Sequence, residues 1–236
     1  MTTVLEAEGL WKVYDTGSTK VQALRGVDLS IEAGEMVAIM GPSGCGKTTL
    51  LNCVSSLDEF SAGEVLVDGR PLSEMSDRER TTMRAERLGF VFQSFNLLPV
   101  LSAAENVEMP LLISGVAPKE ARARALGALE SVGLLDWAGH LPAELSGGQQ
   151  QRVTIARAFV HEPALILADE PTGNLDTSTS EAILDLLVDL NRTQGITFLM
   201  VTHEEGIAQK CTRRVDILDG LITSDEKIAH AGTEEE

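Results

Sequence analysis

GPSGCGKT, residues 41–48, is the stretch of sequence that decides how this chain folds. It follows the apolar run MVAIM at 36–40, which has the length of a buried strand, and it leads into TLL at 49–51. A strand, a glycine loop and a helix start, in this order, form the setting in which the pattern G-x-x-x-x-G-K-S/T binds phosphate groups. We therefore expect a strand–loop–helix unit that binds the phosphates of a nucleoside triphosphate.

Each residue type in this loop suits a chain of phosphates. Glycine lets the backbone curl with its N–H groups facing inward, where side chains would block the anion. Lys47 supplies a positive charge for the terminal phosphates, and Thr48 supplies a hydroxyl group for Mg²⁺. The helix that begins near Lys47 adds about half a positive charge at its N-terminus. The residues expected to contact the nucleotide are Gly41, Pro42, Ser43, Gly44, Cys45, Gly46, Lys47, Thr48 and Thr49.

The composition limits the classes of partner. The chain has 236 residues, of which 43% are hydrophobic, so it can bury the core of one large domain or of two small ones. It carries 36 acidic against 19 basic residues, a formal net charge of -17. A protein that binds nucleic acid usually presents a basic surface, so we expect no nucleic-acid partner. The acidic surplus is interpreted as a solubilising surface.

The sequence gives no sign of a membrane span or of an export signal. No apolar run approaches the ~20 residues that cross a bilayer, and the start MTTVLEAEGL carries acids where a signal peptide has a basic and then an apolar region. The three cysteines, Cys45, Cys53 and Cys211, are odd in number and show no metal-ligand spacing. We therefore expect a soluble protein of the reducing cytoplasm.

Alternation and turn signals predict β-structure near both ends of the chain. Residues 27–32 alternate apolar with polar, the period of a half-buried strand, and the first thirty residues are interpreted as antiparallel strands. Residues 64–67 form another strand before the turn Asp68-Gly69. Residues 215–218 and 221–222 form a hairpin around Asp219-Gly220.

The middle of the chain is predicted to be helical. Ser76-x-x-Glu79 indicates a capping box that opens a short helix through Arg87, and a buried strand follows at 88–92. From Gln93 to about Gly148 no strand-like run occurs. A helix in this segment is expected to start at Pro118 and to stop at Gly133, with an apolar stripe of Ala121, Ala125, Leu129 and Val132.

Two apolar runs of strand length, 164–168 and 196–201, predict parallel strands that are covered on both faces. Between them, Ser178-x-x-Glu181 is expected to cap a helix with the stripe Ile183, Leu187 and Leu190. The predicted organisation is a nucleotide-binding α/β core with an antiparallel β subdomain at 1–92 and 153–228, a helical subdomain at 93–152 and a disordered acidic tail at 229–236.

Two further motifs distinguish among the many proteins that use such a loop. LSGGQQQR at 145–152 is a second glycine turn that opens a helix, and LILADE at 165–170 is an apolar strand that ends in two carboxylates. With Gln93 and His203, each at the end of a predicted strand, these motifs resemble the nucleotide-binding subunits of ATP-binding-cassette (ABC) transporters over about residues 4–222. The resemblance implies a phosphate-loop NTPase (RecA-like) α/β core, an N-terminal antiparallel β subdomain and an inserted α-helical subdomain that carries the LSGGQ signature.

The resemblance also implies an ATPase and gives residues their roles in hydrolysis. Glu170 would orient or deprotonate the attacking water. Lys47 and His203 would contact the γ-phosphate and stabilise charge in the transition state. Gln93 would touch metal and water and would link the helical subdomain to the core. The implied ligands of Mg²⁺ are Thr48, Gln93 and Asp169, since hard oxygen ligands suit that ion.

The nucleotide contacts implied by the resemblance come from two chains. Tyr14 would stack on adenine; the alternative is a core tyrosine at a strand end. The LSGGQ turn offers a helix N-terminus to an anion that the same chain's loop already binds. In the family, two copies stack head to tail. The residues of one copy that would face the other copy's nucleotide are Ser146, Gly147, Gly148 and Gln149. Asp176 would cross the interface, would simply N-cap the next helix, or would do both.

The resemblance implies a membrane partner on a separate chain. SFNLLPVLSAAENVEMPLL at 94–112 and DEPTGNLD at 169–176 are most similar to the ATPases of lipoprotein release, macrolide efflux, antimicrobial-peptide resistance and cell division. Their permeases have few spans and large extracytoplasmic parts. We therefore expect a cytoplasmic subunit that such a permease holds at the inner face of the cell membrane.

ATP would then drive export, extraction of a lipoprotein or peptide, or transmission of force across the membrane. The alternative is a nucleotide-gated assembly or regulatory ATPase that docks on a membrane partner without net transport. The residues expected to form the groove for the permease are Phe95, Leu97, Leu98, Pro99 and Leu101. Their alternative role is the core of the helical subdomain.

Overall fold

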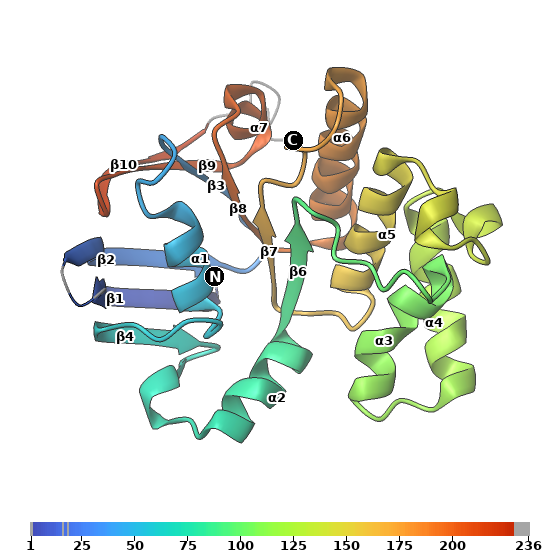
Figure 1. Ribbon diagram of the computed structural model, residues 1–236, viewed down its shortest axis with the longest axis horizontal. Helices are drawn as coiled ribbons and strands as arrows, with labels where there is room; N and C mark the ends of the chain where they lie inside the picture. Colours follow the sequence, from blue (N-terminus) through green and yellow to red (C-terminus); the bar gives the residue numbers. More distant parts are fainter. Residues whose placement is uncertain (1, 16, 18, 229–236) are drawn as a thin grey trace, which may run out of the picture. The chain divides into compact units, whose positions relative to one another are not determined.

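The computed structural model describes residues 2–15, 17 and 19–228 (Figure 1). The chain forms two compact units: unit 1 is Met1–Glu74 with Thr197–Glu236, and unit 2 is Met75–Ile196. The predicted division sets off 93–152 alone, whereas unit 2 also contains the strands and helices on either side of that segment. The predicted boundaries of core and helical subdomain stay a prediction, and the predicted tail at 229–236 lies outside the described residues.

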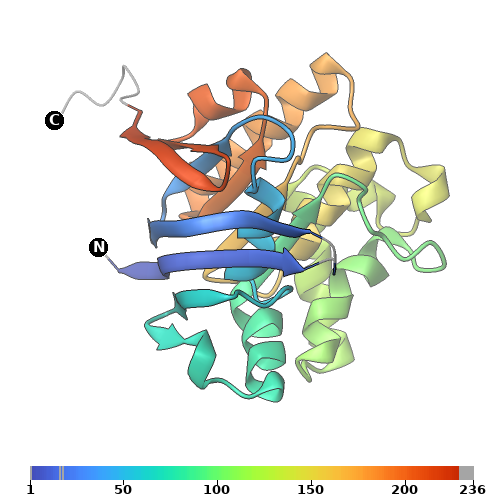
Figure 2. The same ribbon diagram turned by 60° about the vertical axis from the view of Figure 1, so that its left-hand side comes forward.

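Unit 1 contains an antiparallel sheet in the order β2-β1-β4-β5, and Figure 2 shows β2, β1 and β4 edge to edge. Its strands are β1 (Thr3–Asp15), β2 (Lys20–Glu32), β4 (Ala62–Val67) and β5 (Arg70–Pro71). Val27, Leu29 and Ile31 of β2 are buried, so the predicted alternation is confirmed. Gly9 has left-handed backbone at a register shift of β1, so this glycine marks a bulge inside the strand.

The other strands of unit 1 lie in the order β10-β9-β3-β8. They are β3 (Met36–Met40), β8 (Phe198–Thr202), β9 (Arg213–Leu218) and β10 (Leu221–Lys227), and the helices of the unit are α1 (Lys47–Val54), α7 (Glu205–Lys210) and the 3-10 turn η1 (Leu72–Glu74). β3 pairs in parallel with both β8 and β9, and all of its residues are buried. The predicted hairpin around Asp219-Gly220 is confirmed, whereas the predicted strand at 196–201 begins only at Phe198.

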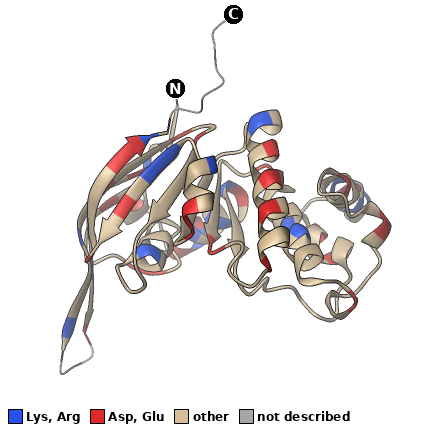
Figure 3. Cartoon of the chain, turned by 90° about the horizontal axis from the view of Figure 1, so that it is seen from above, with Lys and Arg blue, Asp and Glu red and all other residues tan. Residues whose placement is uncertain are grey.

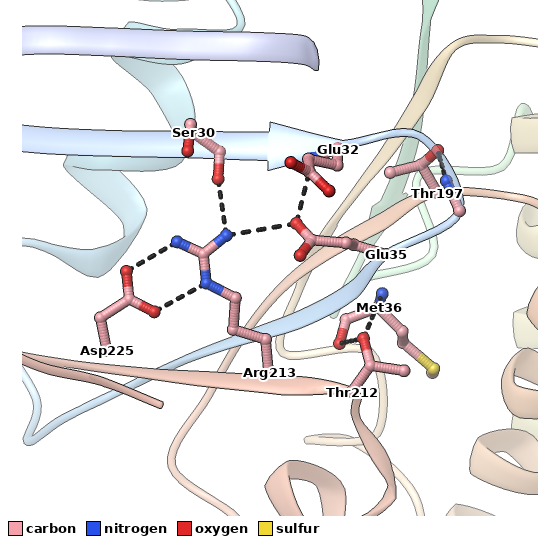
Figure 4. A network of polar contacts seen from close by, with 9 residues as sticks. Ser30, Glu32, Glu35, Met36, Thr197, Thr212, Arg213 and Asp225 are labelled. Atoms are coloured by element: carbon pink, nitrogen blue, oxygen red, sulfur yellow. Dashed lines mark hydrogen bonds and ion pairs between the residues drawn. The ribbon is translucent and has the colours of Figure 1, made fainter. Parts of the chain in front are cut away.

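A charged network joins the two sheets of unit 1 (Figure 4). The guanidinium of Arg213 on β9 donates to both carboxylate oxygens of Asp225 on β10, at 2.7 and 2.6 Å. It also donates to the Ser30 carbonyl of β2 at 2.7 Å and to the Glu35 carboxylate at 3.2 Å. Only 12% of the Arg213 side chain is exposed. The hydrogen bond to Asp225 raises the pKa of Arg213, so the charge that joins β2 to the β9–β10 hairpin is retained.

Unit 2 pairs two strands in parallel, β6 (Leu88–Phe92) and β7 (Leu165–Asp169). Helix α2 (Asp77–Arg87) leads into β6 and begins with the predicted capping box of Ser76 and Glu79. Gly89 of β6 has no room for a side chain, because a Cβ there would overlap the carbonyl oxygen of Ala158. β6 therefore packs directly against helix α5 (Gly147–Phe159).

The remaining helices of unit 2 are α3 (Ala103–Ile113), α4 (Pro118–Ser131) and α6 (Thr177–Gln194), with the 3-10 turns η2 (Leu135–Trp137) and η3 (Pro142–Glu144). α4 begins at Pro118 as predicted, and its stripe of Ala121, Ala125, Leu129 and Val132 is buried. The predicted cap of α6 by Ser178 is wrong, whereas the alternative cap by Asp176 is confirmed. The helix begins after Asp176, because this carboxylate accepts the Thr179 N–H at 3.0 Å and the Ser178 hydroxyl donates to it.

Acidic side chains are spread over strands and helices of the described chain and are not gathered on one element (Figure 3). Such a distribution is expected of a solubilising surface. Among the described residues, no helix combines the length and the apolar character needed to cross a membrane.

Replacing Arg213 by leucine is expected to lower the free energy of unfolding by about 2 kcal/mol or more, because Glu35 then loses its cation in a half-buried place. Urea unfolding followed by circular dichroism measures the change. Arg78→Leu, at an exposed position of α2, is the matched control and is expected to change the stability by less than about 0.5 kcal/mol. Equal stability of the two variants would contradict the role given to Arg213.

Candidate functional site

A cavity of about 520 Å³ lies in unit 1 beside the loop of residues 41–48. Three parts of the unit form its wall: strand β2, the loop with the start of α1, and the turn between β9 and β10. The lining residues are Lys20, Val21, Gln22, Ala23, Arg25, Gly44, Cys45, Gly46, Lys47, Thr48, Thr49, Asp219 and Gly220. The structure therefore brings most of the predicted loop contacts to one hollow.

The backbone of the loop is fixed by its neighbours. The Cys45 carbonyl accepts the Gly220 N–H at 2.9 Å. A Cβ on Gly46 would lie 2.5 Å from the Ala23 carbonyl oxygen, and a Cβ on Gly41 would overlap the Ile217 carbonyl oxygen. Both glycines also have positive φ, 110° at Gly46 and 151° at Gly41. From the sequence, these glycines are expected because side chains would block the anion. The structure adds a second reason, since the protein around Gly41 and Gly46 leaves no space for a side chain.

The Lys47 side chain is held against the loop by two hydrogen bonds. Its ammonium group donates to the carbonyl oxygens of Gly41 at 2.7 Å and of Pro42 at 3.0 Å, and only 7% of the residue is exposed. Gly46 is the N-cap of α1, so the first-turn N–H groups of the helix open toward the same loop. A curled backbone with glycine at three positions, a helix N-terminus and a held ammonium group together fit a phosphate chain.

Tyr14 belongs to a polar cluster at the end of β1. Its hydroxyl donates to Asp58 at 2.7 Å, and Lys12 donates to the other oxygen of Asp58 at 2.7 Å. The Lys12 ammonium also lies 4.7 Å from the centre of the Tyr14 ring. Burial raises the pKa of Asp58, but the bonds from Lys12 and Tyr14 outweigh burial and lower it. Tyr14 is 37% exposed, so the alternative of a core tyrosine is not supported, whereas its contact with adenine stays a prediction.

The two carboxylates of LILADE differ in backbone geometry. Asp169 is the last residue of β7, and Glu170 follows with φ 47°. A glutamate in left-handed backbone is uncommon and costs about 1 kcal/mol, and such strain often marks functional sites. The turn is closed by the Gly173 N–H, which donates to the Glu170 carbonyl at 3.1 Å. The sequence places Glu170 at the strand end but gives no sign of this strain.

Gln93 and His203 both follow strands, as predicted. Gln93 comes directly after β6 in unit 2, and His203 comes directly after β8 in unit 1. Both side chains are exposed. Gln93 is joined to Asn174, whose side chain donates to the Gln93 carbonyl at 2.9 Å. Asn174 lies in the GNLD segment, and no motif of the sequence analysis gave it a role.

The LSGGQ turn begins helix α5. Ser146 is the N-cap, its N–H donates to the Gln149 side chain at 2.9 Å, and its Oγ accepts the Gln149 N–H at 3.3 Å. The N–H groups of Gly147 and Gly148 belong to the first turn, which lacks intrahelical acceptors. A Cβ on Gly148 would lie 2.5 Å from the Thr179 methyl group of α6. The turn thus offers N–H groups to an anion, and its second glycine also lets α5 pack on α6.

Asp176 caps helix α6, as one of its two predicted roles requires. Its carboxylate accepts from the Thr179 hydroxyl at 2.6 Å and from the Ser178 hydroxyl at 2.7 Å, besides the Thr179 N–H. These bonds hold the pKa of Asp176 well below its usual range. The capping role is confirmed, and the contact with a second chain stays a prediction.

The predicted site residues fall into two sets. Unit 1 carries Tyr14, the loop of residues 41–49 and His203, and unit 2 carries Gln93, the LSGGQ turn, Asp169, Glu170 and Asp176. In the described part of the chain, no three or more His, Cys, Asp or Glu side chains gather in a way that could hold a metal ion. A set with a single carboxylate suits Mg²⁺ only where substrate phosphates and water supply the other oxygens, which is the usual way this ion binds.

Comparison with known proteins identifies relatives along nearly the whole chain. A family model described as ABC transporter matches residues 24–173. An uncharacterized ABC transporter ATP-binding protein of Thermotoga maritima is 50% identical over 227 residues, which cover 96% of this chain and 97% of the relative. The lipoprotein-releasing system ATP-binding protein LolD of Bacteroides thetaiotaomicron is 47% identical over 222 residues, which cover 94% of this chain and all of the relative.

Solved structures confirm the predicted fold class. The dimeric structure of MJ0796, a bacterial ABC transporter cassette, matches with a TM-score of 0.87 and 43% identity, covering 96% of this chain and 99% of that one. The same cassette in a dimeric post-hydrolysis state, bound to ADP and Pi, matches with the same TM-score, identity and coverage. Both matches include the α/β elements of unit 1 and the helices of unit 2, since they span nearly the whole chain.

Gly46 has positive φ and also lacks room for a Cβ, and a comparison with Gly34 separates these two effects. Gly34 also has positive φ, 82°, but an added Cβ there would have no neighbour within 4 Å. Gly34→Ala is expected to cost about 1 kcal/mol of unfolding free energy, and Gly46→Ala more than about 2 kcal/mol together with loss of ATP binding. Urea unfolding and ATP titration measure the two effects. Equal costs and intact ATP binding would contradict the account of the loop.

Proposed function

This chain belongs to the ABC transporter family as an ATP-hydrolysing, ATP-binding subunit, and from that membership we propose how it works. Two copies enclose two ATP molecules head to tail, and the opening and closing of this dimer drives a separate membrane permease. The supporting observation is that one chain carries two different anion sites, each at the start of a helix, α1 after the glycine loop and α5 after the LSGGQ turn.

The two sites are complementary in what they offer a nucleotide. The glycine loop encloses phosphates with curled backbone and the Lys47 ammonium. The LSGGQ turn offers the N–H groups of Gly147 and Gly148. It also offers the hydroxyl proton of Ser146, because the Ser146 oxygen already accepts the Gln149 N–H and its O–H can donate elsewhere. Each composite site then uses the loop of one copy and the turn of the other. The MJ0796 cassette, 43% identical, has a dimeric structure, which supports a working unit of two copies.

Hydrolysis proceeds by attack of water on the γ-phosphorus, with the bond from phosphorus to the bridging oxygen of ADP breaking. We assign Glu170 to the water, whose proton it accepts, and Lys47 and His203 to the charge that develops on the γ-phosphoryl oxygens. Thr48, Gln93 and Asp169 are the residues that would hold Mg²⁺, which neutralises charge between the β- and γ-phosphates when bound. The exposed Tyr14 ring, with Lys12 near its centre, is assigned to adenine.

The apolar loop of residues 95–101 in unit 2 is assigned to the permease. Asn106, 1% exposed, accepts the Leu98 N–H at 2.8 Å and donates to the carbonyls of Leu98, Leu101 and Ser102 at 3.0 to 3.1 Å. The loop is thereby held with Leu98 45% exposed and Val100 81% exposed. Of the residues expected to form the groove, Phe95, Leu97 and Leu101 are half-buried, so they serve partly as core. Val100 is the most exposed large apolar side chain of the described residues, and the sequence analysis did not include it.

One of the relatives supports a proposal for the class of permease. A lipoprotein-releasing ATP-binding protein is 47% identical over its whole length. We propose a permease with few spans and a large extracytoplasmic part, and a site of action at the cytoplasmic face of the membrane. The reaction driven by ATP is then extraction or force transmission across the bilayer.

Glu170→Gln is expected to form a stable dimer with ATP and Mg²⁺, because it retains the phosphate contacts and lacks the carboxylate that takes the proton. Light scattering after size-exclusion chromatography measures the mass. The same variant with ADP and Mg²⁺ is the control and is expected to be monomeric. A monomer under both conditions would refute the head-to-tail dimer.

Val100→Glu is expected to reduce recovery of the permease about tenfold or more, because a charge would replace a central apolar contact. Affinity-tagged chain is expressed in its native cells, and the integral-membrane proteins that co-purify are quantified by mass spectrometry. Leu57→Glu, at a 50% exposed position of unit 1, is the control with unchanged recovery. The ATPase rate without permease is expected to stay the same in both variants. Equal recovery from Val100→Glu and Leu57→Glu would show that this loop is not the docking site.

A further inference from the structure

We propose that Asn174 is a positioning residue for Gln93. Through this contact it joins the loop that ends at Asp176 to residues 95–101, the segment assigned to the permease. The inference rests on the proposed role of Gln93 in hydrolysis. It goes beyond that role because it names the residue through which Gln93 is oriented.

Gln93 and Asn174 form a reciprocal pair. The Asn174 side-chain amide donates to the Gln93 backbone carbonyl at 2.9 Å, and the Gln93 side-chain amide donates to the Asn174 side-chain oxygen at 3.4 Å. The first bond is short and fixes the backbone of Gln93. The second is long and restrains the side chain only weakly. Asn174 therefore fixes where Gln93 lies and still allows its amide group to leave for metal and water.

The loop around Asn174 is built against the side chain of Gln93. A Cβ on Gly173 would lie 2.6 Å from the Gln93 amide nitrogen and 3.1 Å from its side-chain carbonyl carbon. Glycine at 173 thus leaves the space that the glutamine occupies. The Gln93 side chain therefore packs beside the backbone of Gly173, next to the residue whose amide bonds to the Gln93 carbonyl.

The loop itself has fixed ends. Gln151 of α5, fully buried, donates its side-chain amide to the Pro171 carbonyl, and Asp176 caps α6. Asn174 therefore lies on a loop between β7 and α6 that is held at both ends. A side chain on a loop held in this way can position a neighbour, whereas one on a freely moving loop cannot.

The chain beyond Gln93 is fixed as well. Arg157 of α5 donates to the carbonyls of Phe95 at 3.1 Å and of Asn96 at 2.7 Å. Both residues have left-handed backbone, with φ 58° and 51°. The strained turn after Gln93 is thus held by α5, while Asn174 holds Gln93 itself. Movement of the permease segment is then passed to Gln93 and, through Asn174, to the loop of Asp176.

A double-mutant cycle on the isolated chain tests this. ATP hydrolysis is measured against ATP concentration for the wild type, Gln93→Ala, Asn174→Ala and the double variant. If Asn174 acts through Gln93, Asn174→Ala lowers kcat roughly tenfold and leaves KM within about twofold. In the Gln93→Ala background the same change has no further effect on kcat. Thr177→Ala, at the exposed first residue of α6 that directly follows this loop, is the control with wild-type kcat.

Thermal unfolding distinguishes an effect of Asn174 on the position of Gln93 from an effect of Asn174 on the stability of the fold. The bond from Asn174 to the Gln93 carbonyl survives in Gln93→Ala, so Asn174→Ala is expected to lower Tm equally in both backgrounds, by about 2 °C. Asn174→Asp, which can accept but cannot donate to the Gln93 carbonyl, is expected to lower kcat at least as much as Asn174→Ala. Equal loss of kcat in both backgrounds, or wild-type kcat in Asn174→Ala, would overturn the inference. Wild-type kcat in Gln93→Ala would instead refute the proposed role of Gln93, and the inference with it.

Discussion

The lack of room for a side chain at Gly41 and Gly46 is the constraint on which the loop of residues 41–48 depends. The carbonyl oxygens of Ala23 on β2 and Ile217 on β9 stand where a Cβ of Gly46 or Gly41 would be. The loop curls at this place because two strands of different sheets meet there. Arg213 of β9 bonds to Ser30 of β2, so the charged network holds together the same two strands that border the glycine loop. The conformation of the loop therefore depends on the arrangement of the strands as well as on its own sequence motif.

Local signals predict much of the fold, because each carries its own backbone preference. The capping box at Ser76, the proline at 118 and the turn Asp219-Gly220 all begin or join the elements that the sequence indicates. The start of α6 is the exception. A serine and an aspartate compete there for the first N–H groups, and the carboxylate is the stronger acceptor. The motifs likewise place Glu170 and Gln93 at strand ends, since apolar runs followed by polar residues are a local pattern.

The features that sequence reasoning missed depend on residues far apart in the chain. The Asn174 and Gln93 side chains that meet are 81 positions apart, and the Lys12–Asp58 pair beside Tyr14 is 46 positions apart. No local period encodes such contacts, because packing decides them. The exposure of Val100 also depends on packing. The buried side chain of Asn106 bonds to the Leu101 carbonyl and so fixes the loop in which Val100 faces water. The motifs are therefore readable from sequence, whereas these contacts between distant residues are not.

The central claim is that each nucleotide site is shared between two copies of the chain. It is tested most directly by mixing two variants in the Glu170→Gln background, Lys47→Ala without a working loop and Ser146→Arg without a working turn. Native mass spectrometry with ATP and Mg²⁺ measures which species form. The account predicts monomers for each variant alone and, in the mixture, a dimer of one copy of each with a single ATP. Monomers only in the mixture, or a dimer of the Ser146→Arg variant alone with ATP bound, would contradict it.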